Sequence, residues 1–227
     1  MAQKELIYVY TNTWRILHWI VFFATIGLSI TGYYIAAPYF WGIPGEAANT
    51  FTMANMRFLH FLCANLYFGV AFIIGTYITF FSTYHAHWKD MLPSPKNIKG
   101  GWIQFKYYWR LKGERTDYMW VDPVDGFIFL LFHILFLHQL ITGFALYVPA
   151  YLTKWWWPTL LHLTTDWIYW IYSDLQGIRF WHHLGLWCII TLFIIHVYLQ
   201  IWKTIKLKNS NIASIFGGYR YRDVNFK

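Results

Sequence analysis

Residues 180–202 read FWHHLGLWCIITLFIIHVYLQIW, an apolar run that contains no Lys, Arg, Asp or Glu. A helix needs ~20 such residues to cross the hydrocarbon core of a membrane. Three other uncharged apolar stretches of similar length occupy residues 16–37, 58–81 and 126–148. The apolar residues run continuously and do not alternate as in barrel strands. The sequence therefore predicts an all-α integral membrane protein, a four-helix bundle of up-down-up-down topology forming one domain over residues 1–227.

The overall composition supports a membrane protein over a soluble one. Hydrophobic residues make up 58% of the chain and charged residues only 12%, whereas soluble proteins average about 25% charged residues. Aromatic residues reach 23%, which suits aromatic belts at two membrane interfaces. The net charge of +8 lies in loops and tails beside the spans. Membrane topology explains it better than nucleic-acid binding, which we do not expect.

The basic residues predict the orientation of the chain. Of the 18 Lys and Arg, only Arg57, Lys154 and Arg179 lie outside the N-terminal tail, the 82–125 loop and the C-terminal tail. Basic loops stay in the cytoplasm. Both termini and the 82–125 loop are therefore expected to be cytoplasmic, whereas the 38–57 and 149–179 loops face outward.

Two further aromatic segments are ambiguous. Trp155–Tyr172 is apolar with a single acid, but it is short and contains Pro158. As a fifth span it would place the two basic ends of the chain on opposite sides. An interfacial segment on the outer surface is the preferred interpretation, and Trp102–Lys112 is expected to lie along the cytoplasmic interface in a similar way.

The spacing of intramembrane histidines predicts two metal sites. His182 and His196 are fourteen residues apart, which places them on one helix face and ~21 Å apart along the axis. His183 lies ~140° away from the direction of His196, so the geometry favours His182. His60 opens the second span, which enters from outside, and should match His182 in depth. His18 opens the first span and should match His196.

Each pair offers two imidazoles from facing helices, an arrangement used for metal sites in helical bundles. Zinc would require a third or fourth ligand, whereas a haem supplies the other four iron ligands itself. The absence of a Cys-x-x-Cys-His motif indicates non-covalent haem b. We therefore expect two bis-histidine haems: an outer one held by the outer pair, His60 and His182, and an inner one held by the inner pair, His18 and His196. Gly32 is placed to make room for the outer haem, and Gly75 for the inner one.

Several motifs occur along nearly the whole chain: Arg15-Ile-Leu-His18-Trp19, Ile30-Thr31-Gly32, Arg57-Phe-Leu-His60-Phe61, Ile141-Thr-Gly143-Phe-Ala-Leu-Tyr147, Trp181-His-His-Leu-Gly185-Leu-Trp187 and the tail Ser214-Ile-Phe-Gly-Gly218-Tyr-Arg220. Together they resemble the b-type cytochrome subunit of membrane-bound nickel–iron hydrogenases, within the wider group of bacterial cytochromes b561. The chain departs from the family pattern at Thr25, Phe180 and Leu192, which leaves the ligand assignments intact.

The resemblance implies a specific electron path. Electrons from hydrogen oxidation by periplasmic hydrogenase small and large subunits would pass through both haems to a membrane quinone. The subunit would anchor those partners in the lipid bilayer of the bacterial inner membrane, within a complex that could form a higher oligomer. No cysteine cluster for nickel and iron is present, so no hydrogenase active site is expected on this chain.

Other residues have weaker assignments. Arg15 and Arg179 each lie near a ligand and could pair with haem propionates, or they could be interfacial arginines. His133 and His138 are candidates for a quinone or proton site, which position suggests is near the inner haem. Each could equally make hydrogen bonds within the bundle. His85 and His87 are further candidates, better interpreted as interfacial residues.

Two competing functions stay open. The chain could serve another quinone-linked oxidoreductase, such as a formate dehydrogenase or thiosulfate reductase, or act as a stand-alone cytochrome b561. Alternatively, it could be a cofactor-free transporter or assembly factor whose histidines relay protons. A haem spectrum would separate the last of these from the others.

Overall fold

The computed structural model describes residues 4–38, 51–82, 88–110, 121–151 and 156–223. The prediction of four membrane-length helices is confirmed: the long apolar helical stretches are Asn12–Ala36, Thr52–Phe81, Pro123–Pro149 and Leu175–Leu207. In chain order the elements are β1 (Lys4–Tyr8), α1 (Asn12–Ala36), α3 (Thr52–Leu62), η2 (Cys63–Gly69), α4 (Val70–Phe81), α5 (Trp88–Met91), α6 (Pro95–Arg110), α7 (Pro123–Tyr151), α8 (Trp156–Thr165), α9 (Trp167–Tyr172), α10 (Leu175–Leu207), α11 (Asn211–Gly217) and β2 (Tyr219–Asp223).

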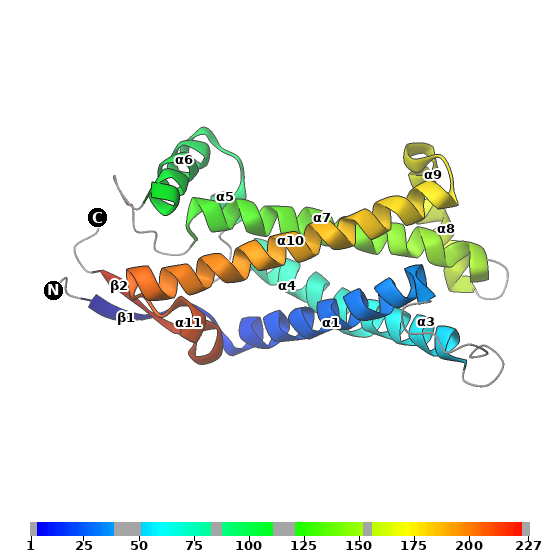
Figure 1. The fold of residues 1–227 in the computed structure, drawn as a ribbon, viewed down its shortest axis with the longest axis horizontal. Helices are drawn as coiled ribbons and strands as arrows, with labels where there is room; N and C mark the ends of the chain where they lie inside the picture. Colours follow the sequence, from blue (N-terminus) through cyan, green and yellow to red (C-terminus); the bar gives the residue numbers. More distant parts are fainter. Residues whose placement is uncertain (1–3, 39–50, 83–87, 111–120, 152–155, 224–227) are drawn as a thin grey trace. The chain divides into compact units, whose positions relative to one another are not determined.

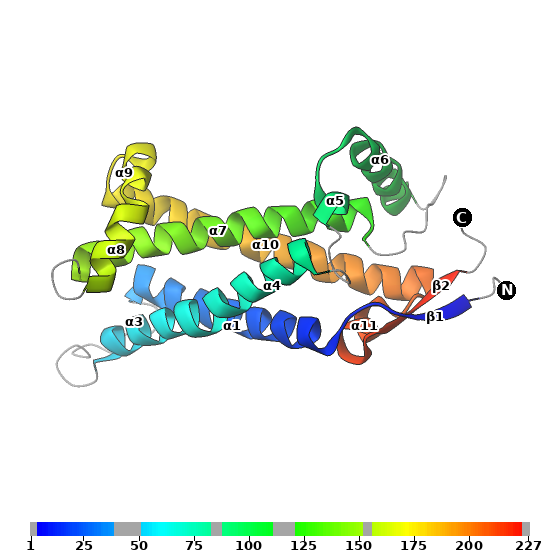
Figure 2. The same ribbon diagram turned by 180° about the vertical axis from the view of Figure 1, so that it is seen from behind.

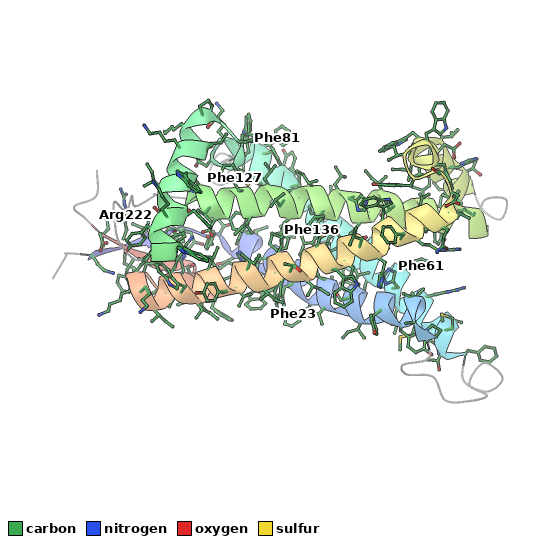
Figure 3. The ribbon with its side chains drawn as sticks, turned by 45° about the horizontal axis from the view of Figure 1, so that its top comes forward. Phe23, Phe61, Phe81, Phe127, Phe136 and Arg222 are labelled. Carbon is green, nitrogen blue, oxygen red and sulfur yellow. The ribbon has the colours of Figure 1, made fainter. Side chains whose placement is uncertain are left out.

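The long helices expose large apolar side chains. Phe23 on α1 is 63% exposed and Phe81 at the end of α4 is 73% exposed, and Figure 3 shows both. The mean hydropathy of the four helices lies between 1.6 and 2.1. Such surfaces are stable against lipid rather than water, so the chain is an integral membrane protein.

The segment between α7 and α10 forms two short helices, α8 and α9 (Figure 2). They contain 10 and 6 residues, far fewer than the ~20 that a span requires. Pro158 lies buried near the start of α8. This agrees with the prediction that no fifth span lies here. The other ambiguous segment, Trp102–Lys112, was expected at the cytoplasmic interface. Its described part, residues 102–110, belongs to helix α6.

A two-stranded antiparallel ribbon near the ends of the chain was not predicted. β1 pairs with β2 in a register that sets Lys4 opposite Asp223 and Tyr8 opposite Tyr219, and α11 precedes β2 beside this ribbon (Figure 1). Gly218 joins α11 to β2 with a φ of 85°. A Cβ there would lie 2.6 Å from the Tyr8 ring, so both backbone conformation and space require glycine.

The chain divides into two compact units. Unit 1 comprises residues 1–21, 71–132 and 192–227, and unit 2 comprises residues 22–70 and 133–191. Each unit therefore contains part of every long helical segment, and each is described separately below.

Within unit 2, aromatic side chains on neighbouring long helices contact one another. Tyr33 of α1 meets Trp187 of α10, Phe61 of α3 meets Tyr147 of α7, and Phe68 of η2 meets Phe136 of α7. The centroid distances are 6.5, 4.9 and 4.9 Å, and the rings meet edge to face, a preferred geometry for aromatic pairs. Together with the order of the long helices, these contacts confirm the predicted all-α membrane bundle.

The second span is interrupted by the π-helical segment η2, directly after the turn that carries His60. The side-chain amide of Asn65 donates to the carbonyl of Phe61. A Cβ at Gly69 would lie 2.9 Å from the carbonyl oxygen of Ala64. Wide turns of this kind are rare and concentrate at functional sites. The expected position of Gly75 beside the inner haem depends on a regular α-helix from His60 to Gly75. The π-helical turns of η2 interrupt that helix, so the expected helical register of Gly75 is wrong.

Candidate functional site

His60 is held by a threonine on the neighbouring helix α1. Its Nδ1 lies 2.9 Å from the Thr31 hydroxyl, and that hydroxyl donates its own proton to the Gly27 carbonyl at 2.7 Å. A hydroxyl has a single proton. Thr31 must therefore accept from His60, so Nδ1 carries the ring proton and Nε2 presents a lone pair.

His182 is held in the same way by α7. Its Nδ1 lies 2.8 Å from the hydroxyl of Thr142, which donates to the His138 carbonyl at 2.6 Å. The Gln139 amide also donates to the backbone carbonyl of His182 at 2.8 Å. Nε2 of His182 is thus the unprotonated nitrogen as well. Metal-binding histidines are usually oriented by a hydrogen bond to the other ring nitrogen.

A glycine follows each of these threonines and packs against the same histidine. A Cβ at Gly32 would lie 3.2 Å from Cε1 of His60, and one at Gly143 would lie 3.4 Å from Cε1 of His182. The dipeptides Thr31-Gly32 and Thr142-Gly143 therefore make equivalent contacts. Each provides one acceptor for the ring and leaves space beside it, whereas Gly75 has no atom within 4 Å of a Cβ position.

Both outer ligands lie in unit 2, and the two rings are close enough to interact electrostatically. His183 makes a different contact, because its Nε2 accepts a hydrogen bond from the Trp187 indole at 3.2 Å on the exposed side of the helix. These contacts support the choice of His182 over His183 as the ligand.

The inner pair lies in unit 1, again with the two rings in electrostatic range of each other. The His18 ring stacks on Trp14 at 5.6 Å, and Phe129 and Phe132 approach the His196 ring at 5.6 and 6.0 Å. Among the described residues, Nδ1 of both histidines is buried and has no hydrogen-bond partner. A polar ring in such aromatic surroundings is costly unless it binds a ligand.

Arg15 lies one turn before His18. One of its terminal nitrogens donates to Asn12, whereas its Nε is buried with no partner among the described residues. A guanidinium with a free buried donor suits a carboxylate such as a haem propionate.

The donor set fits haem better than a free metal ion. No group of three or more His, Cys, Asp or Glu side chains able to hold an ion occurs in the part of the chain that the structure describes. Each pair supplies two imidazole nitrogens, and the outer pair presents both as unprotonated Nε2 atoms. This is the protonation state required of a metal-binding imidazole, and two axial nitrogens are what a macrocycle-bound iron needs.

Two of the four candidate quinone or proton residues lie in the part of the chain that the structure describes. His133 and His138 belong to unit 2, with the outer pair, and not to the unit of the inner pair. Nε2 of His138 lies 3.0 Å from the Tyr172 hydroxyl. His85 and His87 fall outside the described residues.

Comparison with known proteins places this arrangement in a family. The model of prokaryotic cytochrome b561 matches residues 9–218. The chain belongs to the prokaryotic cytochrome b561 family. Proteins named "probable Ni/Fe-hydrogenase B-type cytochrome subunit" are similar to it over most of their length. The protein of Rhizobium leguminosarum bv. viciae is 32% identical over 96% of this chain and 90% of the relative. The protein of Azotobacter vinelandii is 29% identical over 97% of this chain and 90% of the relative. The protein named "probable Ni/Fe-hydrogenase 1 B-type cytochrome subunit" of Escherichia coli K12 is 26% identical, over 94% of this chain and 90% of the relative.

The sequence predicts four histidine ligands, which stay a prediction, and it does not single out the two threonines that contact His60 and His182. A signal was present, because Ile-Thr-Gly occurs at residues 30–32 and again at residues 141–143. In the sequence alone, this repeat is only part of the resemblance to the hydrogenase cytochrome family. Its physical meaning appears once each threonine is found beside a histidine of the next helix.

Replacing Thr31 by valine is expected to weaken haem binding at the outer site about 10- to 100-fold, as is typical when a group that orients a ligand is lost. Valine keeps the shape of threonine but cannot accept the Nδ1 proton. The measurement is haem retained per chain after purification and washing. Thr79→Val is the matched control, since the Thr79 hydroxyl donates to the Gly75 carbonyl of its own helix. Equal haem loss in both variants would show that the contact with His60 has no such role.

Proposed function

We propose that this chain is a di-haem cytochrome b subunit acting as one transmembrane domain over residues 1–227. His60 and His182 hold the outer haem b, and His18 and His196 hold the inner one. The observation that carries the proposal is the pairing itself. Four histidines on three helices form two pairs. Each pair joins two different helices within one compact unit, and the outer pair is oriented by Thr31 and Thr142.

When bound, each haem supplies a reversible one-electron carrier, and two axial histidines leave no open position for oxygen chemistry. The residues of the chain do the rest. Thr31 and Thr142 would hold the His60 and His182 rings so that each Nε2 lone pair is free to bind the haem. Gly32 and Gly143 leave room beside those rings. Arg15 offers its unpartnered Nε to a propionate of the inner haem.

We propose that the electron donor is a Ni/Fe hydrogenase, the enzyme named for the relatives. Its small and large subunits would dock on the outward 38–57 and 149–179 loops. The electrons would leave to a membrane quinone, with both termini of the chain in the cytoplasm of a bacterium and the spans in its inner membrane. This orientation is supported by the distribution of basic residues and the positive-inside rule.

The test is to add hydrogen gas to anaerobic membranes that contain the chain together with the hydrogenase subunits of its source organism. The b-type α-band should appear with hydrogen and disappear when an oxidised quinone is added. Membranes lacking the large subunit are the control. Purified chain without any b-type band would overturn the haem assignment. A band that dithionite reduces but hydrogen does not would overturn only the choice of partner.

A further inference from the structure

A buried lysine lies at the unit 1 end of α10, away from the four haem ligands. Lys203 is 2% exposed. Its ammonium lies 2.5 Å from a carboxylate oxygen of Asp125 and 3.0 Å from one of Asp122, both at the start of α7. Ionisable groups in membrane helices are costly and therefore mark functional sites by default. The sequence alone had suggested a cytoplasmic tail residue here.

Polar side chains from three helices complete this Lys203 cluster. The Tyr108 hydroxyl of α6 donates to Asp122 and accepts from the Gln104 amide at 2.9 Å. The Gln200 amide donates to Asp125 at 3.2 Å and its carbonyl accepts from Asn211 at 3.0 Å. The Gln104 carbonyl oxygen is buried without a partner among the described residues, so the network has an acceptor site left over.

The charges in the cluster do not balance. Two carboxylates face one ammonium, and burial raises the pKa of the Tyr108 hydroxyl, which therefore stays neutral. Tyr10, whose pKa burial also raises, is in electrostatic contact with the cluster and with Arg220 of β2. A second carboxylate beside a single cation favours proton binding.

The cluster is also coupled to the inner haem ligand. Lys203 follows His196 by seven residues, which places both on one face of α10 and about 10 Å apart along its axis. Lys203 is within electrostatic range of the His196 ring. An electron added at the inner haem would therefore place an additional negative charge near the cluster, which favours proton binding by electrostatic attraction.

We propose that the Lys203 cluster is a proton-binding site linked to the redox state of the inner haem. When the iron gains one electron and passes from Fe(III) to Fe(II), the Asp125 carboxylate takes up one proton and becomes a carboxylic acid. The electron comes from the outer haem or from an added reductant, and the proton comes from water. Asp122 is the entry point because its side chain is the most exposed of the three charged groups, at 13% against 11% for Asp125 and 3% for Lys203. Oxidation reverses both steps.

The inference rests on the proposed inner haem, and its test reads that haem directly. In the purified complex, the ratio of reduced to oxidised inner haem is measured at a fixed ambient potential while the pH is raised. Over the pH range in which the cluster binds its proton, this ratio should fall at least threefold for each unit by which the pH rises. Full coupling would give tenfold, or about 59 mV for one electron. Asp125→Asn should reduce this dependence to less than about 1.5-fold, and Asp125→Glu should retain it.

Asp223→Asn is the matched control, since it makes the same change of charge in the ribbon pair with Lys4 and should leave the pH dependence intact. Should Asp125→Asn fail to fold, proton uptake by the unmodified complex still decides the matter. A pH indicator should report most of one proton bound per inner haem reduced by reduced methyl viologen, whose oxidation releases no proton. Uptake near zero, or a full pH dependence in Asp125→Asn, would overturn the inference while leaving the haems in place. A complex without haem would instead refute the proposed function.

Discussion

Alanine in place of His182 is expected to lower the haem content of the purified chain from two haem b per chain to one. In the proposed site His182 would supply one of two nitrogens that hold the outer haem, and its ring is oriented by Thr142 at 2.8 Å. Alanine removes the ligand, and His183 cannot replace it because it points toward Trp187. The measurement is pyridine haemochrome analysis against protein concentration. The remaining haem should keep a b-type spectrum, since the inner pair lies in the other unit.

His183→Ala provides the matched control for that experiment. It deletes the same side chain one residue away and should retain both haems. His60→Ala should lose the same haem as His182→Ala, and the double variant should lose no more than either single one. Equal loss in His182→Ala and His183→Ala, or loss of two different haems on removing His60 and His182, would contradict the outer pair.

Alanine in place of His196 should have the largest effect on electron transfer. The inner haem should be lost, because His196 supplies half of the proposed inner pair and the neighbouring Phe129 and Phe132 rings cannot bind iron. Hydrogen-dependent quinone reduction should then fall to the level of membranes without the subunit. Hydrogen should still reduce the outer haem, because the outer pair is intact.

His18→Ala is the partner experiment and should match His196→Ala in haem content and in quinone reduction. A His196→Ala protein that keeps both haems would contradict the inner pair. One that loses a haem yet reduces quinone at the normal rate would contradict an electron path through both sites.

Features that follow from the length of a membrane span or from the spacing of residues along a helix could be predicted from the sequence. Four uncharged runs predicted four membrane helices, and the fourteen-residue interval between His182 and His196 placed one ligand in each unit. Helical periodicity alone also separated His182 from His183. The four helices could be predicted because the length and pitch of a helix in a membrane are fixed by backbone geometry, whereas the choice of His182 as a ligand stays a prediction.

The features that depend on contacts between distant segments were not predictable. The hydroxyl of Thr31 meets His60 across two helices, and Lys203 meets Asp125 across 78 residues of chain. Pairing of β1 with β2 joins the two ends of the sequence. The π-helical turns of η2 likewise have no marker in composition, and they changed the register assumed for Gly75.

The central claim is that this cytochrome b561 homologue binds two haems, one at each histidine pair. The most direct measurement is the haem b content of the purified wild-type chain, taken with its reduced-minus-oxidised spectrum. We predict two non-covalent haems per chain and a b-type α-band that acid–acetone extraction removes. A purified, folded chain with no haem, or with only one haem under conditions that saturate binding, would contradict the claim.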